Sequence, residues 1–206
     1  ILQAFLGRPD DTPAGDAFER RLYVCRRTIE KKADAEFALR DKIFYVCSMS
    51  SRTIVYKGML VATQMRRFFT DLNDAAVKTA VALVHSRYST NTTPSWERAH
   101  PNRFIIHNGE INTLKGNVNW IRAREPNLYS PVLQHDLERV MPIINREGSD
   151  SAILDNVLEF LVMNGRPLTR AASMLLPEPW DHNDSLSEEC RRSEEHTSEL
   201  QSRITI

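Results

Sequence analysis

Two short apolar runs that lead into polar loops constrain the fold of this chain more than any other feature. Residues 80–84 (AVALV) run into His85, and residues 104–106 (FII) run into His107. Each run is too short for a stable helix and is typical of a buried strand. The loops that follow, as far as residue 125, are rich in Asn, His, Arg and Trp. The pattern predicts two strands that end in hydrogen-bonding side chains, which fits either a functional site or two ordinary turns.

Further strands are predicted where other short apolar runs occur, at residues 22–25, 43–47 and 53–56. Only residues 48–52 separate the last two runs, so these are expected to form a hairpin with a longer loop. Neighbouring strands of this kind are typical of an antiparallel or mixed sheet. With helices packed on that sheet, the expected fold class is α+β.

Helices are predicted at residues 28–39, 63–69, 117–124 and 167–176, and in the segment that follows Gly148. In that segment the apolar residues follow helical spacing. They are Ile153, Leu154, Val157, Leu158, Leu161 and Val162. Ser149, Asp150 or Ser151 can cap the start of this helix, and Asn164 followed by Gly165 can end it.

Composition excludes some classes of partner. Lys and Arg together number 27, as do Asp and Glu, so the net charge is zero and a nucleic-acid partner is not expected. No apolar run approaches the ~20 residues that span a membrane, so a membrane partner is not expected either. Three widely spaced cysteines form neither a disulfide framework nor a metal knuckle, which favours a reducing compartment. The expected location is cytoplasmic, with a plastid as the alternative. Cys25 and Cys47 lie in predicted strands and are expected to be buried and unreactive.

Composition also predicts a boundary near residue 184. Residues 1–183 are expected to form one domain, whereas residues 184–206 are rich in Ser, Glu and Arg and lack apolar periodicity. Within the second segment, residues 192–202 (RSEEHTSELQS) are similar to translated sequencing-adapter read-through. We expect this segment to be a non-native or disordered tail that packs against nothing.

Four motifs carry a resemblance to a known family. They are HSRYSTNT at residues 85–92, HNGEINT at 107–113, GNVNW at 116–120 and GSDSA at 148–152. Residues 3–180 resemble the glutaminase domains of the glutamate synthase family, which are class II glutamine amidotransferases of the N-terminal-nucleophile hydrolase superfamily. The EINT and GNVNW elements distinguish this family from other class II amidotransferases. The resemblance implies a four-layer αββα sandwich, here incomplete at its N-terminus.

The resemblance also implies roles for five residues. The side-chain amide of Asn108 and the backbone N–H of Gly109 would form an oxyanion hole for hydrolysis of the glutamine side-chain amide. Arg87 would hold the α-carboxylate of glutamine, Thr90 would assist there, and Asp150 would take the α-ammonium group. The ammonia released would serve reductive amination of 2-oxoglutarate. Without the resemblance, Arg87 could be in a surface ion pair and Asp150 could be a helix cap.

The nucleophile of that family is an N-terminal Cys whose own amine acts as the base. Position 1 here is Ile1, so we expect the chain to begin inside the domain and to be inactive by itself. No cofactor is expected on this part. For the full-length enzyme the resemblance implies FMN, an iron–sulfur cluster, and FAD with NAD(P)H, or ferredoxin, as electron source. The implied partners are glutamine, the synthase domain of the same chain and, in the full-length protein, a homo-oligomer.

Two alternatives remain from the residues. One is another class II amidotransferase, such as an asparagine or phosphosugar-amine synthase, which the motifs around Trp96 and Trp120 disfavour. The other is a structural or metal-binding module built on His85, His100 and His107. No helix-spaced His pair or carboxylate cluster supports that module, so no metal ligand is expected.

Overall fold

The computed structural model describes residues 2–37, 44–88, 93–108, 111, 114–146, 148–176 and 187–188. Within these ranges the regular elements are helices, and no strand occurs. The α-helices are α1 Asp16–Phe37, α2 Ala62–Phe68, α3 Leu114–Arg124, α4 Leu137–Val140, α5 Asp150–Met163 and α6 Leu168–Leu175. Short 3₁₀ segments are η2 Thr70–Asn73, η3 Glu125–Asn127 and η4 Gln134–Asp136. None of the described helices is long and apolar enough to cross a membrane.

Helix α1 begins earlier than the sequence predicts. The strand predicted at residues 22–25 is wrong, because these residues lie inside the helix. The buried residues Phe18, Leu22 and Arg26 recur every four positions, and buried Ala33 follows two helical turns later on the same face. Asp16 and Glu19 lie in the first turn, where negative charge favours the helix dipole. Cys25 is exposed on this helix, which also corrects the expectation that it is buried.

Helix α5 has the boundaries that its sequence predicts. Ser149 is the N-cap, and its side chain accepts a hydrogen bond from the backbone N–H of Ala152 at 3.2 Å. Gly165 follows the helix with φ of +87°, the left-handed conformation that glycine adopts without strain. Its N–H donates to the carbonyl of Val162, and that of Arg166 donates to the carbonyl of Leu161. These two bonds form a Schellman motif that ends the helix.

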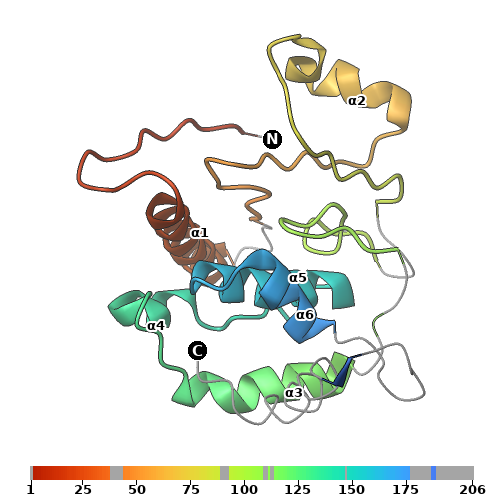
Figure 1. Ribbon diagram of the computed structural model, residues 1–206. Helices are drawn as coiled ribbons and strands as arrows, with labels where there is room; N and C mark the ends of the chain where they lie inside the picture. Colours follow the sequence, from red (N-terminus) through yellow and green to blue (C-terminus); the bar gives the residue numbers. More distant parts are fainter. Residues whose placement is uncertain are drawn as a thin grey trace.

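The core lies where α5 packs against α1 and α6, and α4 packs against α1. Figure 1 shows α5 and α6 at the centre, α1 above them to the left, α4 to their left and α3 below. Val157, Leu158, Phe160 and Leu161 of α5 are buried there. Helix α2 stands apart at the top of the view and buries no residue. The helices predicted at residues 63–69, 117–124 and 167–176 correspond to α2, α3 and α6 and are confirmed.

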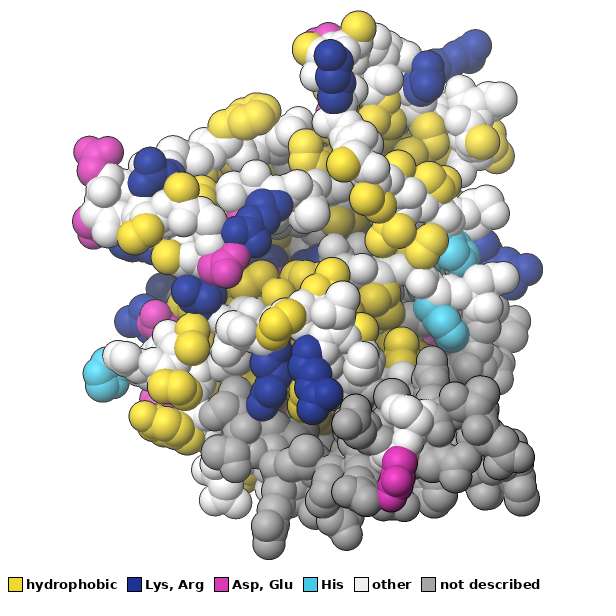
Figure 2. All heavy atoms as spheres, in the orientation of Figure 1, with side chains coloured by type: hydrophobic (Ala, Val, Ile, Leu, Met, Phe, Trp, Pro, Cys, Tyr) yellow, Lys and Arg dark blue, Asp and Glu magenta, His cyan; other side chains and the backbone are white. Residues whose placement is uncertain are grey.

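Unlike the predicted helices, the predicted strands do not form among the described residues. Residues 44–47, 53–56, 80–84 and 104–106 form no strand, and residue 43 lies outside the described ranges. Val81 is 72% exposed and Val84 is 77% exposed, so the run at 80–84 is not buried. In Figure 2, hydrophobic side chains gather at the surface over the upper right of the molecule. A strand requires a partner for its backbone hydrogen bonds, and the described residues supply none. The sheets of the expected αββα sandwich are therefore not confirmed.

Candidate active site

Asp150 connects the start of α5 to the segment that carries the predicted oxyanion hole. Its Oδ2 atom accepts a hydrogen bond from the backbone N–H of Ile111 at 2.7 Å. Its Oδ1 atom accepts one from the N–H of Ser151 at 2.7 Å. The N-cap of α5 is Ser149, so Asp150 is the first residue of the helix and not its cap. Its carboxylate holds the chain three positions beyond Asn108.

A second carboxylate holds the same segment further upstream. Asp155 of α5 is 1% exposed. Its carboxylate accepts hydrogen bonds from the backbone N–H groups of Arg103, Phe104 and Ile105 at 3.1, 2.7 and 3.0 Å. Burial raises the pKa of Asp155 to about 6, and the nearby charge of Glu159 adds to this shift. These three hydrogen bonds attach residues 103–105 to α5. They are made in the segment where the sequence predicts a strand, at residues 104–106.

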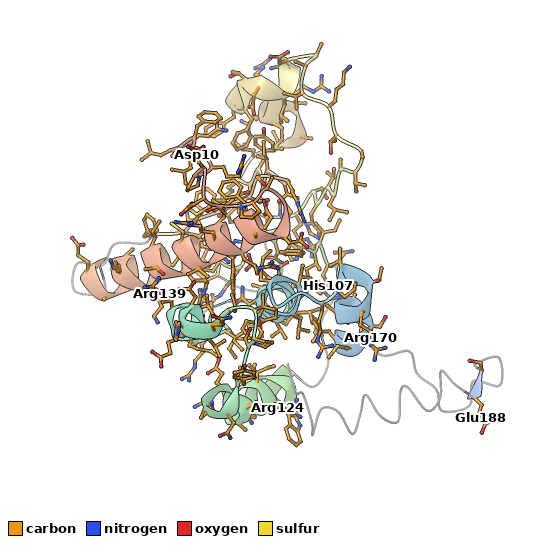
Figure 3. The ribbon with its side chains drawn as sticks, turned by 60° about the vertical axis from the view of Figure 1, so that its left-hand side comes forward. Asp10, His107, Arg124, Arg139, Arg170 and Glu188 are labelled. Carbon is orange, nitrogen blue, oxygen red and sulfur yellow. The ribbon has the colours of Figure 1, made fainter. Side chains whose placement is uncertain are left out.

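His107 and Asn108 follow directly from that segment. Nδ1 of His107 lies 3.3 Å from Oγ of Ser151, which is also in α5. Figure 3 shows His107 beside this helix. Asn108 is exposed, so its amide is accessible to a ligand. Gly109, the second predicted oxyanion donor, lies outside the described residues.

Arg87 is exposed and makes no side-chain hydrogen bond or ion pair with another described residue. Its backbone contacts the ring of His85, because Nδ1 of His85 lies 2.7 Å from the carbonyl oxygen of Arg87 and 3.2 Å from its backbone nitrogen. The ring of His85 stacks on the ring of His100, with centroids 4.5 Å apart and planes at 22°. The N–H of His100 donates to the carbonyl of Tyr88 at 3.1 Å. Thr90, the predicted assistant of Arg87, lies outside the described residues.

His100 shows that these segments meet in one region. It is 8% exposed, and neither ring nitrogen has a hydrogen-bond partner within the described part of the chain. Burial lowers the pKa of His100 to about 4. The charges of His85, Lys57 and His107 act in the same direction, and Asp150 opposes them. His100 therefore lies against the segment of Arg87, through its contacts with His85 and Tyr88.

The two described cysteines differ in exposure. Cys25 is exposed on α1, and Cys47 is half-buried. Burial raises the pKa of the Cys47 thiol, which disfavours its thiolate. Within the described ranges, no group of three or more His, Cys, Asp or Glu side chains is arranged to hold a metal ion.

Sequence reasoning missed a buried charge network beside this region. Arg26 of α1 pairs with Glu159 of α5 at 2.5 Å and with Glu30 at 2.8 Å, and Arg103 pairs with Glu30 at 3.2 Å. The i,i+4 spacing of Arg26 and Glu30 was a visible signal. A cleft of about 350 Å³ adjoins the network, and its walls come from α1, α5 and the segments around residues 97–103 and 142–148. Neither Arg87 nor Asn108 lines it.

Comparison with known proteins identifies the family of this chain. The family described as glutamine amidotransferases class-II matches residues 1–203. This chain belongs to the class-II glutamine amidotransferases. The chain is 50% identical over 200 residues to the "Glutamate synthase [NADPH] large chain" of Bacillus subtilis, covering 97% of this chain and 13% of that protein.

Two other relatives show the same relationship. The chain is 47% identical to the "Glutamate synthase [NADH]" of Schizosaccharomyces pombe, over 84% of this chain and 8% of that protein. It is 43% identical to the "Ferredoxin-dependent glutamate synthase, chloroplastic" of Spinacia oleracea, over 83% of this chain and 10% of that protein. The amidotransferase chain thus spans a small part of the length of each relative. These relatives do not favour the asparagine or phosphosugar-amine synthase alternative.

The family confirms the resemblance carried by the four motifs. The roles of Arg87, Thr90, Asn108, Gly109 and Asp150 stay predictions, since no ligand is bound. The domain boundary near residue 184 also stays a prediction, and the family match extends beyond it to residue 203.

Proposed function

We propose that this amidotransferase chain is the glutaminase part of a glutamate synthase. It would bind glutamine and hydrolyse its side-chain amide, and the ammonia would serve reductive amination of 2-oxoglutarate elsewhere in the complete protein. One observation carries the proposal. Asp150, the proposed ligand of the α-ammonium group, is hydrogen-bonded to Ile111, three residues after the proposed oxyanion donor Asn108. The names of the relatives supply the reaction class.

The residue types suit the two ends of glutamine. A guanidinium can hold a carboxylate through two parallel hydrogen bonds, so exposed Arg87 suits the α-carboxylate. A carboxylate oxygen accepts about two hydrogen bonds. Oδ2 of Asp150 accepts one from Ile111, so it retains capacity for an ammonium group. Arg87 would bind the α-carboxylate and Asp150 the α-ammonium group, and together they would select an α-amino acid over a simple amide.

The chemistry at the amide end requires a nucleophile and a stabilised oxyanion. A thiolate would add to the amide carbon, and the negative oxygen would be held by the Asn108 amide and the Gly109 N–H. The intermediate would then release ammonia to leave a thioester, and water would release glutamate. Loss of one oxyanion donor typically costs about 10²–10³ in rate. We expect the thiol to be an N-terminal Cys whose amine takes the proton, since burial disfavours the thiolate of Cys47 and Cys25 has no free α-amine.

The complete domain would be the four-layer αββα sandwich that the family resemblance implies. The complete protein would use FMN and an iron–sulfur cluster in its synthase part, with electrons from NAD(P)H or ferredoxin. The names of the relatives include NADPH, NADH and ferredoxin, and the proposal holds with any of the three as donor. A cytoplasmic location is proposed, with a plastid as the alternative.

The test compares two nitrogen sources in the complete protein. Arg87→Lys should lower kcat/KM for glutamine by roughly 10- to 100-fold, because hydrogen bonds to charged groups contribute about 1.5–3 kcal/mol. Glutamate formation from added ammonia should stay unchanged, since ammonia bypasses the glutaminase site. Arg139→Lys, on the exposed side of α4, is the matched control and should alter neither activity. Equal losses with glutamine and with ammonia would mean that Arg87 serves the fold and not the substrate.

A further inference from the structure

Lys57 is a buried cation that the proposed reaction does not use. It is 3% exposed. Its ammonium group donates to the carbonyl of Ala99 at 2.9 Å, to that of Trp96 at 3.3 Å and to the hydroxyl of Tyr45 at 3.2 Å. The ammonium also lies 4.8 Å from the centre of the Tyr45 ring. Three donors thus meet three acceptors, and two of those acceptors belong to one short turn at residues 96–99.

Residues 96–100 also contact the segment that contains Arg87. The N–H of His100 donates to the carbonyl of Tyr88 at 3.1 Å. The rings of His100 and His85 stack at 4.5 Å, and the rings of Trp96 and Tyr88 meet edge to face at 6.0 Å. Residues 85–88 therefore rest on residues 96–100 at three points. Nδ1 of His85 lies 2.7 Å from the carbonyl oxygen of Arg87 and 3.2 Å from its backbone nitrogen, so the last contact in the series reaches the backbone of Arg87 itself.

We infer that Lys57 is a positioning residue for Arg87, and that it acts by holding residues 96–100, on which residues 85–88 rest. This inference rests on the proposed function, because the group that Arg87 positions is the α-carboxylate of glutamine. Lys57 would touch no substrate atom. Its effect would appear only for ligands that carry that carboxylate.

The cost of burying Lys57 supports a specific role. Burial lowers the pKa of Lys57 to about 8, so Lys57 stays mostly charged at neutral pH but holds its proton less tightly than in the unfolded chain. A buried cation is weak evidence for stability, because an apolar side chain of the same shape often packs as well or better. An apolar side chain cannot donate hydrogen bonds to the carbonyls of Trp96 and Ala99, so it cannot fix the positions of these two groups relative to each other. The arrangement therefore specifies the geometry of the turn.

The experiment measures ligand binding to the complete protein by isothermal titration. One ligand is glutamine, and the other is 4-aminobutanamide, which is glutamine without its α-carboxylate. Lys57→Met should weaken glutamine binding by about 3- to 30-fold, the range typical of substitutions that act through a packed network. Binding of 4-aminobutanamide should not change. Lys31→Met is the matched control, because Lys31 is exposed and donates to one backbone carbonyl, that of Glu138. It should alter neither affinity.

A double-substitution cycle separates positioning from general damage. If Lys57 acts through Arg87, then Lys57→Met with Arg87→Gln should bind glutamine no more weakly than Arg87→Gln alone. Additive losses, or equal losses for both ligands, would overturn the inference. His85→Ala removes the stacking contact at a half-exposed position, so it tests the same series of contacts should Lys57→Met fail to fold. An unchanged preference for glutamine in His85→Ala would also overturn it.

The same measurements distinguish failure of the proposed function. If Arg87→Gln leaves glutamine binding unchanged, or the unaltered chain binds no glutamine, the proposed function and this inference both fail. If Arg87→Gln weakens binding but Lys57→Met and His85→Ala do not, only the inference fails.

Discussion

Arg26→Met should destabilise this protein strongly, because it leaves a buried carboxylate without its cation. Arg26 is 2% exposed and pairs with Glu159 at 2.5 Å across the α1–α5 interface. Glu159 is buried and has no other ion-pair partner among the described residues. Glu30, the second partner of Arg26, keeps Arg27 and Arg103. The stranded charge is therefore that of Glu159.

The expected magnitude follows from that geometry. Removing one partner of a buried ion pair typically costs about 3–5 kcal/mol, whereas whole domains are stable by only about 5–15 kcal/mol. For a chain of this size each kcal/mol lowers Tm by about 2–4 °C, so Tm should fall by about 6–20 °C. Glu30 reports the same network. Burial would raise the pKa of Glu30, but Arg26, Arg103 and Arg27 together lower it.

Urea unfolding followed by circular dichroism measures the free energy of unfolding. The control is Arg139→Met, which breaks the exposed pair between Arg139 and Asp136 and should cost less than about 1 kcal/mol. A loss from Arg26→Met no larger than that of the control would refute the reasoning. The double variant Arg26→Met with Glu159→Met should recover stability relative to Arg26→Met alone, since it removes the stranded charge. Purely additive losses would assign the cost to packing instead.

Three smaller predictions concern single side chains. The pKa of His100 is lowered from 6.5 to about 4, so the unfolded chain binds the proton more tightly and stability is lost as pH falls through this window. Relative to His100→Phe, the unaltered chain should therefore lose up to about 3 kcal/mol between pH 6.5 and 4 in urea titrations. The pKa of Asp155 is raised from 3.8 to about 6, so the sign reverses. Relative to Asp155→Asn, the unaltered chain should gain up to about 3 kcal/mol as pH falls from 6 to 3.8, and a constant difference would contradict the shift. Ser149→Ala should cost about 1 kcal/mol in urea unfolding because α5 loses its cap, whereas exposed Ser173→Ala in α6 should stay within about 0.5 kcal/mol.

The sequence by itself determined the features that depend on neighbouring residues. The start of α5 at Ser149 and its end at Gly165 were predictable, because a cap and a left-handed glycine act within one helical turn. The spacing of its apolar residues predicted the helix itself, but not the burial of Asp155, Glu159 and Phe160. The motifs around Arg87 and Asn108 predicted the family before any contact was known. These signals are local, so a linear sequence carries them.

Local patterns gave a wrong prediction where a short apolar run and a helical spacing of buried residues overlap. Residues 22–25 are a short apolar run typical of a strand, yet the helical spacing from Phe18 through Leu22 to Arg26 prevailed in α1. An apolar run as short as residues 80–84 cannot by itself report burial or pairing, because a strand exists only with a partner. The outcome at each run depends on which distant segment lies beside it.

Only the tertiary structure decided how the candidate site is held together. Asp150 binds the N–H of Ile111, Asp155 binds residues 103–105, and Lys57 binds the carbonyls of residues 96 and 99. Each contact joins side chain to backbone across dozens of residues. Any Asp or Lys can make such a bond with any exposed backbone group, so the residue type does not name its partner. The partner is chosen by the packing of α1, α5 and the segments between them, which arises only when the whole chain buries its apolar surface.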